Sequence, residues 1–376
     1  MSLERDDIDA AVAAGVIPQA QADALNAFTA ERRRARFGQS GQEDESFRFM
    51  TGFNDFFFAI GILLLGGGIT IFTIAPFGIP FFTDSGVDTF LCAAAAALMW
   101  GLSELLVRRM RLVLPGILLS VFFLSFVYRV IPEDLVGSSV PRFPLASPLA
   151  HMLFGVTGAP LVTATKALIG TAAAGLYYWR FRLPFALLPI GTSLVVAIRS
   201  LVELAFGQIP ATANSLLGLA CGLAVFAVAM RYDISDRERL TRRCDCAFWL
   251  HLLAAPLIVH SLISLIVPSL IAINNVVASA ILLIVAVLTI VAIAIDRRAL
   301  LVSALLYVGM VIAYAIGGNW ATQNYSDRSF VFYGTPVILG VFVITLGVGW
   351  MPLRRGLIGL ISPAIAARLP PVPSRA

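Results

Sequence analysis

Ten long apolar stretches, separated by short turns that carry arginine, constrain the fold of this chain more than any other feature. The hydrocarbon core of a bilayer is about 30 Å thick, so a helix needs roughly 20 apolar residues to cross it. Of the 376 residues, 59% are hydrophobic and only 13% are charged. The predicted spans are 56–75, 88–107, 112–131, 161–179, 183–206, 212–230, 246–267, 273–295, 299–317 and 330–350. Because these runs are continuous and do not alternate in polarity, they predict an all-α, polytopic α-helical integral membrane protein with about ten transmembrane helices.

The positions of the cations predict the orientation of these helices. Arginine and lysine next to a span resist translocation and stay in the cytoplasm. If the amino terminus is cytoplasmic, all but five of the 27 Lys and Arg residues lie in cytoplasmic segments. The five others are Arg129, Arg142, Lys166, Arg199 and Arg328. We therefore expect a multi-pass protein of a bacterial inner membrane, with the lipid bilayer around it and both termini cytoplasmic.

Aromatic residues beside the arginines support the same frame. Tyr177 and Trp179 precede Arg180, and Trp350 precedes Arg354. Tryptophan and tyrosine favour the headgroup level of a membrane, so we expect all three at this level.

The polarity of the chain predicts three regions. Residues 1–50 are polar and read as a cytoplasmic helical hairpin with a linker, residues 51–352 as the membrane domain, and residues 353–376 as a cytoplasmic interfacial helix with a proline-rich tail. In the hairpin, Gly15 suits a left-handed helix stop and Pro18 suits the first turn of a second helix. Two such short helices cannot bury a self-sufficient core, so we expect the hairpin to dock on the membrane domain or on a cytoplasmic protein partner.

The hairpin carries a resemblance to a known group of proteins. The run Ile8-Asp9-Ala10-Ala11-Val12-Ala13-Ala14-Gly15-Val16-Ile17, followed by Gln21-Ala22-Asp23-Ala24-Leu25 and a many-span domain, resembles the DUF2157-like family of bacterial membrane proteins. The resemblance implies this organisation and no particular activity.

Ionisable residues within the spans mark the first candidate site, because each is costly in hydrocarbon. Arg199 and Glu203 are four apart and so share one helical face. The other candidates at the predicted outer level are Lys166, Arg129 and His260. Three interpretations stay open: an outward-facing cavity for an anion, a structural Arg199–Glu203 pair with snorkelling cations, or a proton relay through Glu203 and His260.

A second candidate cluster lies where the seventh span leaves the cytoplasm. Its residues are Asp245, Trp249, His251 and Arg243. Just before it, Asp236 or Thr241 is placed to cap a helix. The spacing of the nearby cysteines and His251 does not match a metal-ligand pattern, so we expect no metal and no cofactor.

Glu104 and Arg108 are also four apart, at the inner end of the second span, and we expect a boundary ion pair there. The chain contains none of the common hydrolase, metalloprotease or phosphate-loop motifs. Its net charge of +5 is dispersed over many turns and is explained by topology, so we expect no nucleic-acid partner.

Three functions stay open on these grounds. The first is a transporter or flippase-like carrier for an anionic small molecule or a lipid headgroup. The alternative is a non-catalytic scaffold or sensor that recruits a cytoplasmic partner through residues 1–50. The third, an enzyme acting on lipid-linked substrates through Glu203 or His260, is the least favoured.

Overall fold

The computed structural model of the chain describes residues 12–16, 18–25, 28, 53–74, 85–130, 160–236, 241–266, 274–317, 325–360 and 369. The chain forms two compact units, Met1–Arg48 and Phe49–Ala376.

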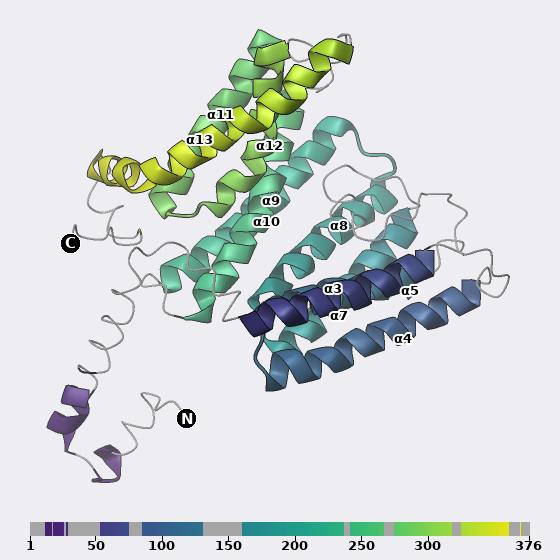
Figure 1. Cartoon of the computed structure of the whole chain (residues 1–376), viewed down its shortest axis with the longest axis vertical. Helices are drawn as coiled ribbons and strands as arrows, with labels where there is room; N and C mark the ends of the chain where they lie inside the picture. Colours follow the sequence, from purple (N-terminus) through teal and green to yellow (C-terminus); the bar gives the residue numbers. More distant parts are fainter. Residues whose placement is uncertain are drawn as a thin grey trace. The chain divides into compact units, whose positions relative to one another are not determined.

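Helices over the ten predicted ranges make up the described part of the second unit (Figure 1). Their bounds are α3 Phe53–Ile74, α4 Ser85–Ser103, α5 Val113–Val130, α7 Pro160–Phe181, α8 Leu187–Phe206, α9 Ala211–Ser235, α10 Arg242–Ile266, α11 Asn275–Ile295, α12 Ala299–Gly317 and α13 Tyr325–Leu360. The predicted all-α polytopic fold is confirmed.

Eight of the described helices are long and apolar enough to cross a membrane. The helices α7 and α12 are outside this group of eight, since α7 carries Lys166 and Arg180 among small polar residues and α12 is a shorter apolar helix. The number of ten transmembrane helices therefore stays a prediction.

Two helices extend well past their predicted ends. The helix α9 continues to Ser235, more than one turn beyond residue 230, so Asp233 is part of the helix. The helix α13 continues through Pro352 to Leu360 without a break at the end of the predicted membrane domain. Hydropathy marks where a helix stops being apolar. The backbone hydrogen bonds of α9 and α13 continue beyond that point.

A π-helical segment, η2, follows α4 directly over Glu104–Arg109. The amide of Met110 donates to the carbonyl of Leu105 at 3.1 Å, which is the i→i−5 spacing of a π-helix. Arg111, with a φ of 59°, then turns the chain into α5.

The helix α10 lies at the centre of the packing, in contact with α8, α9, α11 and α12. Glycines allow α9 to approach it closely. A Cβ atom built on Gly222 would lie 2.9 Å from Ile258 Cγ1 and from Leu257 Cβ. Among the helices that precede α9 in the chain, α4 and α7 each pack against α5, and α7 packs against α8.

In the first unit, Gly15 has a φ of 70° and its amide donates to the carbonyl of Val12 at 3.0 Å. This confirms the predicted left-handed helix stop. Pro18 opens the next helical turn, where the amide of Ala22 donates to its carbonyl at 3.2 Å. Ala22 is buried, whereas Val16 and Phe28 are exposed.

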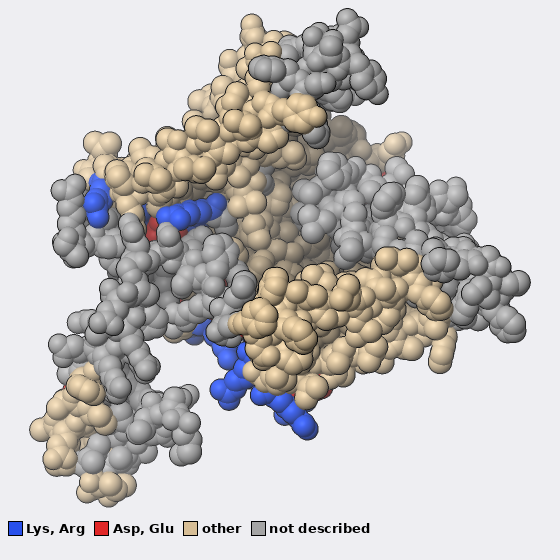
Figure 2. All heavy atoms as spheres, viewed as in Figure 1, with Lys and Arg blue, Asp and Glu red and all other residues tan. Residues whose placement is uncertain are grey.

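The described surface of the second unit is largely apolar. Many leucine, isoleucine, valine and phenylalanine side chains of α3, α11 and α13 are exposed, among them Leu64, Leu283 and Val348. On the face drawn in Figure 2, basic side chains form a few separate groups and most of the described surface carries no charge. Such a surface needs lipid as its solvent, and the protein is an integral membrane protein with several spans.

Candidate functional site

The turns that carry arginine meet at one end of the helices. Arg180 of α7 contacts Glu104 of η2 at 2.8 Å, and the hydroxyl of Tyr178 lies 4.0 Å from the thiol of Cys246 in α10. At this same end, the turn between α11 and α12 contacts Asp233 of α9 and Trp350 of α13. We call this end of the helices the arginine-rich end. It is defined by Arg108, Arg180, Arg242, Arg297 and Arg354.

Three charged or titratable side chains are buried together at the arginine-rich end. Asp233 of α9, His251 of α10 and Arg297 before α12 are only 8%, 0% and 1% exposed. The Oδ2 atom of Asp233 is 2.8 Å from His251 Nε2 and accepts from Arg297 Nε at 3.2 Å, while its Oδ1 accepts from Arg297 Nη2. We call these three residues the buried charge cluster.

Phe226 and Cys244 pack around the buried charge cluster. The ring of Phe226 meets the His251 ring edge-on, with the centroids 5.3 Å apart. Arg297 Nη2 also lies 3.5 Å from both the carbonyl oxygen and the sulfur of Cys244. One carboxylate thus joins α9, α10 and the turn before α12.

The residues on either side of Arg297 bind the last helix instead. Asp296 adopts a left-handed conformation and accepts from Trp350 Nε1 at 2.8 Å. Its other oxygen lies 3.6 Å from Nη1 of Arg354, which is buried, and the guanidinium of Arg298 lies 5.3 Å from the Trp350 ring centroid. The turn Asp296–Arg298 therefore links α9, α10 and α13 by charge and hydrogen bonding.

Of the predicted cytoplasmic-face cluster, His251 is part of this arrangement. Trp249 lies on another side of α10, where its ring meets Phe185 edge-on at 4.7 Å. Arg243 is exposed and Asp245 is half-buried. Thr241 caps α10, because its hydroxyl accepts from the amide of Arg243 at 3.2 Å, and Asp236 in turn accepts from the Thr241 hydroxyl at 2.6 Å.

Sequence reasoning missed Asp233 and Arg297. The available signal was the pair Arg297–Arg298 in a turn of only a few residues between two apolar helices. The predicted ion pair between Glu104 and Arg108 is confirmed at 3.3 Å, and Arg180 joins it.

The other predicted site gathers around Arg199, on α8. Its Nε and Nη2 donate to the amide oxygen of Asn214 in α9, at 2.9 and 2.7 Å. Glu203 is exposed one turn further on and acts on Arg199 through its charge. Arg199 is also close enough to His260 of α10 for its charge to act on the imidazole. The Nδ1 atom of His260 lies 2.8 Å from the hydroxyl of Tyr307 in α12. We call Arg199, Glu203, Asn214, His260 and Tyr307 the Arg199 group.

Arg129 and Lys166 are both half-buried, on α5 and α7. Near them the hydroxyl of Tyr128 donates to that of Ser193 at 2.9 Å, which ties α5 to α8. A cavity bounded by Arg129, Lys166, Arg199 and Glu203 stays a prediction.

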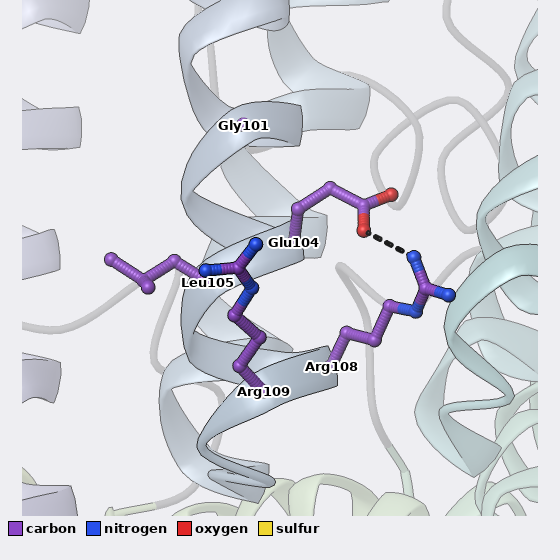
Figure 3. Close-up of a pocket in the computed structure, with 5 residues that line it drawn as sticks. All are labelled: Gly101, Glu104, Leu105, Arg108 and Arg109. Carbon is purple, nitrogen blue, oxygen red and sulfur yellow. Dashed lines mark hydrogen bonds and ion pairs between the residues drawn. The ribbon is translucent and has the colours of Figure 1, made fainter.

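Two surface pockets are found at the arginine-rich end. One, of about 480 Å³, is lined by Gly101, Glu104, Leu105, Arg108 and Arg109, and is shown in Figure 3. The other, of about 380 Å³, is lined by Tyr178, Trp179, Arg182, Pro184, Arg242 and Cys246. Within the described ranges, no group of three or more His, Cys, Asp or Glu side chains could hold a metal ion.

Comparison of the chain with protein-family models, with curated proteins and with solved structures gives no match in any of the three. The functional argument therefore depends on the residues alone, and the resemblance to the DUF2157-like family stays a prediction.

Proposed function

We propose that the protein is a transporter or flippase-like carrier for an anionic small molecule or a lipid headgroup, with Arg199 as the anion-binding residue. The observation that carries the proposal is the pairing of Arg199 with Asn214. Two hydrogen bonds fix the plane of the guanidinium, but their acceptor is a neutral amide. These two hydrogen bonds thus orient the guanidinium.

An oriented guanidinium is well suited to a carboxylate or phosphate, because its N–H donors match two oxygens at once. Arg199 is half-buried in a helix that is long and apolar enough to span a membrane, where ionisable side chains frequently mark functional sites. Glu203, His260 and Tyr307 supply a carboxylate, an imidazole and a hydroxyl around it. These polar groups are suited to contact a solute, and the imidazole of His260 is a group that can exchange protons.

Thiol labelling tests this proposal. Glu203→Cys is made in a chain whose four native cysteines are replaced, and Leu204→Cys, on the adjacent exposed and apolar position of α8, is the matched control. A membrane-impermeant maleimide is applied from each side of sealed vesicles. We expect labelling of Glu203→Cys from one side, slowed by inorganic phosphate or acetate, and no labelling of the lipid-facing control.

Protection of Glu203→Cys from both sides in a folded protein would overturn the proposal. Labelling at the same rate with and without phosphate and acetate would mean that Arg199 does not bind these anions. In both cases the Arg199–Asn214 pair would be a structural link between α8 and α9.

A second function is favoured by one observation, the separate first unit. Residues Met1–Arg48 form their own compact unit and expose the apolar side chains of Val16 and Phe28. Under this alternative the unit recruits a cytoplasmic protein, and the membrane domain is its anchor. A chain that lacks residues 1–48 would then keep its thermal stability in detergent but lose all activity in cells, whereas a transporter would keep its anion-dependent labelling.

A further inference from the structure

The π-helical segment η2 and the pocket beside it point to a site that is separate from the Arg199 group. Fewer than about 1% of residues in globular proteins are in π-helices, and these segments are frequent at functional sites. Here the segment lies at the end of a spanning helix, where Glu104, Leu105, Arg108 and Arg109 line a pocket of about 480 Å³ together with Gly101.

The pocket has an apolar part. A Cβ atom built on Gly101 would meet no other atom within 4 Å, so the missing side chain leaves open space. Leu105, four residues later, is 47% exposed. Both belong to the segment Thr89–Arg109, which is long and apolar enough to span a membrane. This part of the pocket therefore faces lipid.

The pocket also has a cationic part. Glu104 already contacts two guanidinium groups, Arg108 at 3.3 Å and Arg180 at 2.8 Å. Arg109 and Arg111 are exposed beside them. Figure 3 shows the Arg109 side chain extending alongside Leu105, whereas Glu104 and Arg108 face each other across the pocket. Glu104 is thus shared by two arginines, and Arg109 adds a third cation to the pocket.

We propose that this pocket binds an anionic phospholipid, with the headgroup phosphate at Arg108 and Arg109 and an acyl chain against Gly101 and Leu105. The charge excess favours a phosphate, since guanidinium groups bind phosphate oxygens through two parallel hydrogen bonds. The apolar wall favours a ligand that has a hydrocarbon chain next to its phosphate, and clusters of arginine at the end of a spanning helix attract anionic lipids. The site does not depend on the proposed transport function.

Two variants test the two parts of the pocket in the full chain. Gly101→Leu fills the apolar part without meeting protein atoms, and Arg109→Gln removes one cation. Each has a matched control. Gly61→Leu changes an exposed glycine of α3 that also has open space around it, and Arg355→Gln removes an exposed arginine near the end of α13.

Binding is measured on the purified protein by native mass spectrometry and by the rise in Tm, with phosphatidylglycerol, phosphatidylcholine or inorganic phosphate added. We expect phosphatidylglycerol to bind and to raise Tm more than the other two. We expect Gly101→Leu and Arg109→Gln each to weaken its binding about tenfold, which corresponds to about 1.4 kcal/mol. Both controls should bind as the unchanged protein does, and Tm without lipid shows that each variant is folded.

Several results would overturn the proposal. Equal loss of binding in Arg355→Gln would mean that phosphatidylglycerol responds to general surface charge. Full binding of phosphatidylglycerol by Gly101→Leu would mean that no acyl chain lies against Gly101. An equal effect of phosphatidylcholine would mean that the pocket does not recognise the charge of the headgroup. An equal rise in Tm with inorganic phosphate would make this a phosphate site and not a lipid site.

Discussion

The buried charge cluster and the Arg199 group each hold one arginine between α-helices, but the contacts described for the two arginines differ. Arg297 is 1% exposed and pairs with the carboxylate of Asp233, whereas Arg199 is half-buried and donates to the neutral amide of Asn214. Removing one partner of a fully buried ion pair is strongly destabilising. The first arrangement therefore fits a structural link, whereas the second fits the anion-binding role proposed for Arg199.

The largest effect should come from removing the charge of Asp233. Asp233→Asn keeps the shape of the side chain but leaves Arg297 buried beside a neutral group, which should lower the free energy of unfolding by about 3–5 kcal/mol. Thermal or denaturant unfolding in detergent measures the change. Glu203→Gln, which removes an exposed carboxylate of α8, is the control and should change stability little. Similar losses in both variants would mean that burial does not distinguish the two groups.

A paired change should lessen that damage. Replacing Asp233 and Arg297 together by leucine removes both charges, so no uncompensated ion is left in the protein. The double variant should be more stable than Arg297→Leu alone, because the single change leaves Asp233 without its guanidinium partner. Unfolding of the two single variants and the double variant gives the interaction energy. Additive losses would contradict an ion pair as the source of stability.

A smaller loss is expected at the edge of the same end. Trp350→Phe keeps an aromatic ring but removes the N–H that donates to Asp296 and leaves part of the buried indole volume unfilled. The expected loss is about 1–3 kcal/mol, from one hydrogen bond and a small cavity. The shift in Tm measures it, and Trp179→Phe, at an exposed position, should leave Tm unchanged.

The smallest effect on stability, and the sharpest test of the comparison, is expected from Asn214→Asp. This change gives Arg199 a carboxylate partner of the same shape, as Arg297 has in Asp233. Stability should be kept or slightly raised, while phosphate and acetate should no longer slow the labelling of Glu203→Cys. If the anions still protect the thiol, Arg199 is not the residue that binds them.

Local patterns in the sequence predicted much of this molecule. All ten predicted ranges contain a helix, because each run of apolar residues is long enough to satisfy its own backbone hydrogen bonds. The Glu104–Arg108 pair, the Thr241 cap and the left-handed Gly15 were also predictable, since each depends on residues within four positions of one another.

The aromatic residues show where such patterns fail. Trp179 is exposed, as expected of a headgroup-level residue, but Tyr177 and Trp350 are buried in the protein. Tyr177 lies against Trp100 and within 2.9 Å of the Ser103 hydroxyl, so it faces α4 and not lipid. Neighbouring residues on a helix point in different directions, and the packing of other helices determines which of them meets lipid.

The sequence by itself determined the all-α fold, the positions of its helices and the gathering of arginines in alternate turns, because hydropathy and charge act on each segment separately. Only the tertiary structure decided that Asp233, 64 positions from Arg297, is its partner, and that Arg199 donates to Asn214. The physical reason is that a polar group removed from water must find its partner on whichever helix packs beside it. That choice depends on helix contacts and on close approaches such as the one at Gly222, which no local spacing encodes.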